Sequence, residues 1–188
     1  ILNLTPDSFS GDGVYYDLEA AQSAADYHFR SGARFVDIGA ESTRPGATPI
    51  GADEEWRRLA PALEAVAGGN AASFSIDTIH PETVWRISST IGQMIINDVS
   101  GMNNPAMRET VAECGVSVIV SHLDHASGTD IQKAHKEKPT KSVQKVVDEL
   151  RFRAEQLMDL GLAPEQIILD PGWGFGKAPE IYRGLLED

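Results

Sequence analysis

The chain has 188 residues, of which 41% are hydrophobic, and this is enough for one sizeable core. Its 28 acidic and 16 basic side chains give a formal net charge of −12, which argues against nucleic acid or an anionic membrane surface as a partner. The apolar runs are far shorter than the roughly 20 residues that cross a bilayer, and no basic leader followed by an apolar stretch opens the chain. We therefore expect a soluble, cytoplasmic protein.

Short apolar strands alternate with amphipathic helices along the chain. The predicted strands are residues 1–4, 35–39, 74–77, 94–98, 116–122 and 167–170. The predicted helices between them are residues 18–31, 53–67, 81–90, 105–113 and 142–160. This alternation predicts an α/β protein with a parallel sheet and right-handed crossovers.

Polar residues recur at the C-terminal ends of the predicted strands, and this favours a barrel over a doubly wound sheet. They are Asn3, Asp37, Asp77, Asn97, Asp98, His122 and Asp170. In a (β/α)8 TIM barrel such positions converge on one mouth, whereas a Rossmann sheet would show a G-x-G-x-x-G turn after its first strand, and none follows here. Six strands correspond to about six of the eight β/α units of a barrel. We expect residues 1–188 to form a single barrel domain that is incomplete at its C-terminus.

Two of these strands end in a carboxylate, Asp77 in SIDT and Asp170 in ILDPGWGFGK. One interpretation is that each caps the following helix or loop, which Asp does well. The other is that both carboxylates, together with Asn97, bind a ligand in a common mouth. Carboxylates and an amide match the adjacent N–H donors on the edge of a pterin or purine ring, and we favour this interpretation.

Two further segments suggest anion or metal binding. The strand that contains Asp37 runs into Glu41, Ser42, Thr43 and Arg44, and hydroxyls with a guanidinium are suited to hold an anion. In an acidic chain, the oxygen of Asn3 could also ligate Mg²⁺, which takes few protein ligands besides water and phosphate. The spacing of His122 and His125 resembles a zinc motif, but only one such pair occurs, so we do not expect zinc.

Five segments of the chain, in this order, resemble the dihydropteroate synthase family, the folate-pathway enzymes that sulfonamides inhibit. They are ILNLTPDSFS, DIGAESTRPGA, SIDT, INDVSGM and LDPGWGFGK. The resemblance implies a transferase that joins p-aminobenzoate to 6-hydroxymethyl-7,8-dihydropterin diphosphate and gives 7,8-dihydropteroate and pyrophosphate. It also implies Mg²⁺ as the cofactor, a TIM barrel and a homodimer, with small-molecule substrates and no nucleic-acid or membrane partner.

The resemblance also assigns roles to individual positions. The pterin ring would be bound by Asp77, Asn97 and Asp170, with Phe175 near its face. Asn3 would lie beside Mg²⁺ and the diphosphate, whereas Thr43 and Arg44 would hold substrate. Phe9 and Pro45 would help to form the p-aminobenzoate pocket. Within this set, we assign the reaction chemistry to Asn3, Arg44, Asp77 and Asp170.

The sequence departs from the family pattern in several places. The first loop reads SFSGDG instead of SFSDGG, which moves the carboxylate to Asp12, and Ala40 replaces a usual Gly. Ser121 and Leu123 flank His122 where the family usually has Met, and the basic motifs of the last two strands are absent. Two alternatives therefore stay open: a pterin-binding methyltransferase module of the same barrel superfamily, and a non-catalytic pterin-binding homologue.

Overall fold

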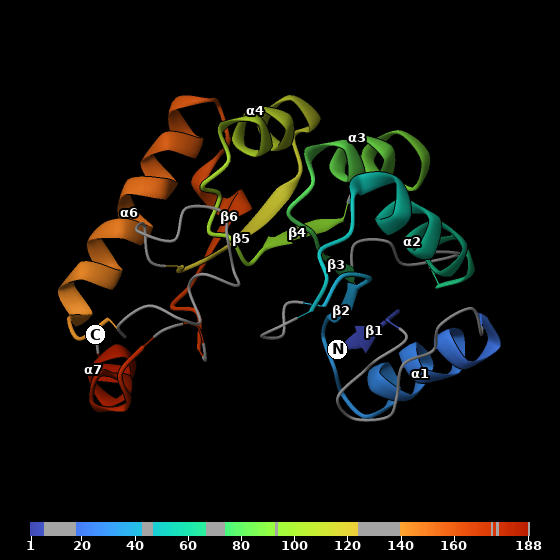
Figure 1. Cartoon of the computed structure of the whole chain (residues 1–188), viewed down its shortest axis with the longest axis horizontal. Coiled ribbons are helices and arrows are strands. Elements are labelled where there is room, and N and C mark those ends of the chain that lie inside the picture. Colours follow the sequence, from blue (N-terminus) through green and yellow to red (C-terminus); the bar gives the residue numbers. More distant parts are fainter. Residues whose placement is uncertain are drawn as a thin grey trace. The chain divides into compact units, whose positions relative to one another are not determined.

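The computed structural model describes residues 1–5, 18–42, 47–66, 74–92, 94–123, 140–173, 175 and 177–187. In these ranges strands and helices alternate along the chain (Figure 1). The chain divides into two compact units, one made of Ile1–Ser42 and Ala47–Asn97 and the other mainly of Asp98–Asp188. The prediction of a single domain stays a prediction.

The first unit contains a parallel sheet with helices between its strands. Its elements are β1 (Leu2–Asn3), α1 (Leu18–Arg30), β2 (Val36–Gly39), α2 (Ala52–Val66), β3 (Phe74–Asp77), α3 (Pro81–Thr90) and β4 (Ile95–Asp98). Each strand pairs in parallel with the next strand along the chain, from β1 to β4. Parallel neighbours in chain order are what successive β/α units produce.

The second unit continues the same alternation. Its elements are α4 (Pro105–Cys114), β5 (Ser117–Ser121), α6 (Val143–Asp159), η3 (Pro164–Gln166), β6 (Ile167–Asp170), η4 (Pro179–Ile181) and α7 (Tyr182–Glu187). Strand β5 pairs with β6 in parallel, with Val118 opposite Ile167 and Ser121 opposite Asp170. The structure adds η3, η4 and α7 to the predicted elements.

Local signals explain where several helices begin. Asn104 accepts a hydrogen bond from the backbone N–H of Ala106 at the start of α4, and Ser142 accepts one from Lys145 at the start of α6. Such side chains satisfy backbone donors that the first turn of a helix leaves without partners. Proline follows the cap residue in α3 and α4, where its missing N–H costs nothing.

The core of the first unit depends on the two-residue period of its strands. Val36, Ile38 and Ile76 are buried, and the ring of Phe74 meets that of Phe29 on α1 at a centroid distance of 5.4 Å. The residues between them, such as Asp37 and Ser75, belong to the opposite face of the sheet. That face is therefore polar, and its strand ends carry the candidate site.

The observed boundaries differ from the predicted ones by at most one residue at each end of the strands and helices that the sequence indicated. In the described parts of the chain, every helix is too short or too polar to cross a membrane.

Candidate active site

One row of residues crosses the C-terminal strand ends of the first unit. Asn3 lies opposite Gly39, Gly39 lies opposite Asp77, and Asp77 lies opposite Asn97. Residues in register on parallel strands point to the same face of a sheet. Three of the residues predicted from the sequence, Asn3, Asp77 and Asn97, therefore share one face, and each is half-buried.

Gly39 leaves space within this row. A Cβ atom at this position would lie 3.4 Å from both Cβ and Oδ2 of Asp77. The glycine therefore opens the sheet surface beside the Asp77 carboxylate, between the strands that carry Asn3 and Asp77. A ligand of that carboxylate can approach the backbone of β2 here.

Asp37, which lies two residues before Gly39 on β2, orients the Asn97 side chain. Its carboxylate accepts a hydrogen bond from Ser75 Oγ at 2.5 Å and from Asn97 Nδ2 at 3.3 and 3.4 Å. Among the described residues, Asn97 Oδ1 is buried without a hydrogen-bond partner. Because buried polar atoms normally have a partner, this oxygen is a free acceptor that Asp37 holds in place.

The surroundings of Asp37 shift the pKa of its carboxyl group. Burial raises the pKa of Asp37, while the hydrogen bonds from Ser75 and Asn97 act in the opposite direction. Desolvation disfavours the charged form, and donors that point at the carboxylate favour it. The sequence identified Asp37 as a polar strand end but gave no sign that it would support Asn97.

Asp170 ends β6 in the second unit. Its Oδ1 accepts a hydrogen bond from the backbone N–H of Gly172 at 2.9 Å, and its Oδ2 accepts one from Ser121 Oγ at 3.1 Å. The carboxylate therefore caps its own loop, as the first interpretation of this residue expected. Its predicted contact with a pterin stays a prediction.

Lys177 organises the loop that follows Asp170, and the sequence analysis missed it. Its side chain is buried, and Nζ donates to the carbonyl oxygens of His122, Gly172 and Phe175 at 3.0 to 3.1 Å. A lysine has three donors and no acceptor, so three carbonyl oxygens suit it fully. This contact ties the backbone at Gly172 and at Phe175, the half-buried residue predicted near the pterin face.

Two other polar strand-end residues have structural contacts. Asp98 is fully buried and accepts hydrogen bonds from the backbone N–H groups of Ser100 and Met102, so it belongs to the turn and not to the row of Asn97. Its position at the end of a strand predicted that it would lie at the mouth with Asn97, but adjacent residues of a strand face opposite sides. His122 is also buried, with Nε2 2.8 Å from Glu149 Oε2 on α6.

Several predicted site residues lie outside the described parts of the chain. They are Phe9, Asp12, Thr43, Arg44, Pro45 and His125. Their roles stay predictions.

The sequence was compared with known proteins. The family model described as pterin binding enzyme matches residues 1–188. The dihydropteroate synthase of Escherichia coli strain K12 is 38% identical over 177 residues, which are 94% of this chain and 61% of that protein. The dihydropteroate synthase of Haemophilus influenzae is 32% identical over 188 residues, 100% of this chain and 67% of that protein. The chain thus spans about three fifths of the Escherichia coli relative.

Solved structures agree with these matches. A Yersinia pestis dihydropteroate synthase in a sulfonamide drug complex is similar with a TM-score of 0.86 and 31% identity, covering 99% of this chain and 66% of that one. A Burkholderia cenocepacia dihydropteroate synthase complexed with 7,8-dihydropteroate gives a TM-score of 0.76 and 34% identity, over 94% and 58%. The predicted fold, an α/β protein of the (β/α)8 TIM-barrel class, is confirmed.

Proposed function

The chain belongs to the family of pterin-binding enzymes, and within it to the dihydropteroate synthases, and from this premise we propose the activity of the complete protein. It joins p-aminobenzoate to 6-hydroxymethyl-7,8-dihydropterin diphosphate and releases 7,8-dihydropteroate and pyrophosphate. Two related solved structures support this choice: the Burkholderia cenocepacia dihydropteroate synthase is complexed with 7,8-dihydropteroate, and that of Xanthomonas albilineans holds 4-aminobenzoic acid.

The observation that carries the proposal is the row of Asn3, Gly39, Asp77 and Asn97. It combines a carboxylate, an open glycine position and a buried amide oxygen that has no partner among the described residues. A reduced pterin offers a ring N–H and an exocyclic amine as neighbouring donors. Acceptors at Asp77 and Asn97 would take these donors, and discrimination would follow because an analogue without them leaves the buried acceptors unsatisfied.

The family resemblance assigns Asp170 and Phe175 to pterin binding as well. The carboxylate of Asp170 would accept a further N–H, and Phe175 would lie against the ring face. During the reaction, positive charge develops on the pterin as its carbon loses the diphosphate. The carboxylates of Asp77 and Asp170 would stabilise that charge, and fixed charges of this kind need no reorganisation at the moment of reaction.

Asn3 fits the Mg²⁺ that the family implies. Its amide oxygen is a hard ligand, it is half-buried at a strand end, and its neighbour in register, Gly39, has no side chain. When bound there, Mg²⁺ would act as a Lewis acid on the departing diphosphate.

The second substrate needs little activation. The amine of p-aminobenzoate is neutral and already nucleophilic, so no strong general base is required. Its carboxylate and the diphosphate need cationic or hydroxyl partners, for which we propose Thr43 and Arg44. Phe9 and Pro45 would line the same pocket.

We further propose a homodimer in the cytoplasm, and the net charge of −12 supports a protein that binds neither nucleic acid nor anionic membranes.

The proposal is tested with the full-length protein that contains this chain. We expect p-aminobenzoate-dependent release of pyrophosphate from the pterin diphosphate in the presence of Mg²⁺. Asn97→Ala should lose about 1.5 kcal/mol or more of pterin binding, measured by calorimetry. Asp53→Asn, at an exposed carboxylate on α2, is the matched control and should behave as wild type.

Three other results would change the proposed function or the role of Asn97. Pterin binding without turnover would select the non-catalytic homologue. Methyl transfer to a corrinoid would select the methyltransferase module. Full activity in Asn97→Ala would leave the synthase in place but would remove Asn97 from the pterin site.

A further inference from the structure

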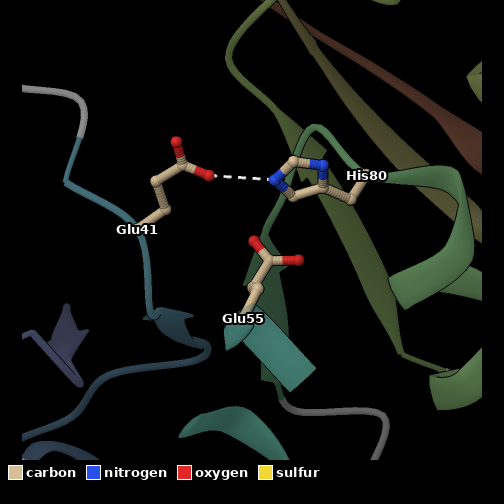
Figure 2. Close-up of side chains that lie close together, drawn as sticks. All are labelled: Glu41, Glu55 and His80. Carbon is tan, nitrogen blue, oxygen red and sulfur yellow. Dashed lines mark hydrogen bonds and ion pairs between the residues drawn. The ribbon is translucent and has the colours of Figure 1, made fainter. Parts of the chain in front are cut away.

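Three side chains that could bind a metal ion lie close together in the first unit, and none of them belongs to the proposed substrate site. Glu41 follows β2, Glu55 lies in the first turn of α2, and His80 precedes α3. Each offers one ligand atom, and the three atoms lie within 4.8 Å of one another. Figure 2 shows the carboxylates of Glu41 and Glu55 directed toward the imidazole of His80.

The contacts within this cluster leave one acceptor free. His80 Nε2 lies 3.0 Å from Glu41 Oε2. Glu55 is fully buried, and its Oε2 accepts a hydrogen bond from Thr78 Oγ1 at 2.7 Å. Its other oxygen, Oε1, is also buried, and within the described ranges it accepts no hydrogen bond of ordinary geometry, although the Thr83 hydroxyl, itself buried without a partner, lies near enough to lower the pKa of Glu55. A buried carboxylate oxygen without a partner is costly, so this atom points to a missing ligand.

The backbone holds the three side chains in place. The N–H of Ile50 donates to Glu41 Oε1 at 3.3 Å, so that oxygen is also engaged. The N–H of His80 donates to Thr78 Oγ1, the same hydroxyl that donates to Glu55. The cluster is therefore built by the ends of β2 and β3 and the start of α2, rather than by flexible surface side chains.

The charge of the cluster is negative when His80 is neutral. Two carboxylates then share one place with an imidazole. Burial raises the pKa of Glu55, against the effect of the hydroxyls of Thr83 and Thr78. The hydrogen bond to Glu41 raises the pKa of His80. Both shifts favour the protonated forms of these groups.

Other charged groups near the cluster come from the same elements. Glu82 on α3 favours the protonated form of His80. Arg58 on α2 donates to the carbonyl oxygen of Ala40 at 3.1 Å and pairs with Glu54 at 2.6 Å. A divalent ion would balance both carboxylates.

We propose that Glu41, Glu55 and His80 form a binding site for a divalent transition-metal ion, with Zn²⁺ or Mn²⁺ as the class that the ligands fit. One imidazole nitrogen and two carboxylate oxygens are typical ligands of these ions, whereas Mg²⁺ prefers oxygen ligands alone. The site is chemically distinct from the proposed Mg²⁺ position at Asn3. Its occupation would tie the ends of β2 and β3 to α2 and stabilise the first unit, and it does not depend on the proposed transferase activity.

The test uses the full-length protein, purified without a polyhistidine tag and stripped with a chelator. Co²⁺ serves as a spectroscopic probe, and Zn²⁺ and Mn²⁺ are titrated in separate experiments without pterin diphosphate. We expect one equivalent of Co²⁺ with visible absorption bands of protein ligation, a higher melting temperature with metal, and tighter binding as the pH rises, because the ion displaces protons.

Variants assign the ion to this cluster. Glu55→Gln and His80→Gln should each weaken Co²⁺ binding by at least about tenfold. Glu64→Gln, at an exposed carboxylate further along α2, is the matched control and should bind as wild type. If Glu55→Gln does not melt cooperatively, Glu41→Gln takes its place, because Glu41 is only partly buried.

The proposal is overturned if the wild-type protein binds no equivalent of these ions, since the cluster is then a hydrogen-bonded contact between His80 and the carboxylates without a metal. It is equally overturned if binding persists unchanged in the Glu41, Glu55 and His80 variants. Neither result bears on pyrophosphate release, so the fate of this site and that of the proposed transferase can be distinguished.

Discussion

The strand ends of the two units use polar side chains in different ways. In the first unit, Asn3, Asp77 and Asn97 share one row, and a buried oxygen of Asn97 has no partner among the described residues. In the second unit, Asp170 accepts hydrogen bonds from its own loop and from Ser121, and Lys177 donates to three carbonyl oxygens. A polar residue at a strand end can therefore either bind a ligand or hold its own loop by hydrogen bonds. Only its hydrogen-bond partners distinguish these two roles.

We expect the largest loss of stability from a substitution at Gly172, where the loop after β6 closely approaches the backbone of His122. Gly172 has φ +70°, and a Cβ there would lie 2.3 Å from the carbonyl oxygen of His122. Gly172→Ala should therefore lower the free energy of unfolding by about 3 kcal/mol or more, measured by urea denaturation. Gly161→Ala is the control, because φ is +103° but nothing lies within 4 Å. An equal loss in both variants would attribute the effect to backbone conformation and not to the close approach.

The contacts of Lys177 should have the next largest effect. Lys177→Met keeps most of the side-chain volume but leaves three carbonyl oxygens without their donor, and we expect a loss of about 3 kcal/mol in the free energy of unfolding. Lys141→Met, at an exposed lysine, should change stability by less than about 0.5 kcal/mol. A wild-type value for Lys177→Met would mean that the loop does not depend on this side chain.

The first unit should respond in activity and not in stability. Asp77→Asn keeps the size of the side chain but removes the charge that would bind the pterin. We expect kcat/KM for the pterin diphosphate to fall about 10- to 100-fold, with little change in the urea midpoint. Asp53→Asn is again the surface control. A large loss of stability with unchanged kcat/KM would make Asp77 a structural residue, like Asp98.

The smallest effect is a pH dependence. Burial raises the pKa of Asp37 above its ordinary value of 3.8. The native state therefore keeps this proton to a higher pH than the unfolded state does, and the contribution of Asp37 to stability falls as the pH rises from 3.8 through its native pKa. Relative to Asp37→Asn, the wild-type protein should lose free energy of unfolding over this window, measured by urea denaturation at several pH values. A difference that is constant with pH, or that grows in favour of wild type, would contradict this expectation.

The sequence was informative wherever a local pattern decided the outcome. The strands at Phe74–Asp77 and Ile167–Asp170 and the helix at Pro81–Thr90 were predicted with their observed boundaries. Asp77 and Asn97 were both predicted at strand ends, and the register of β3 and β4 places them opposite each other. What failed was the placement of Asp98 at the common mouth with Asn97, because adjacent residues of a strand face opposite sides.

The sequence by itself determined the α/β alternation, the strand ends and the family, because these depend on neighbouring residues and on short motifs. Only the tertiary structure decided which polar side chains find partners. Glu41, Glu55 and His80 are far apart in the chain and meet because β2, α2 and β3 are packed in one unit. Lys177 reaches the carbonyl oxygen of His122 across 55 positions of sequence. Such pairings follow from the register of parallel strands and the packing of helices, and no local pattern encodes them.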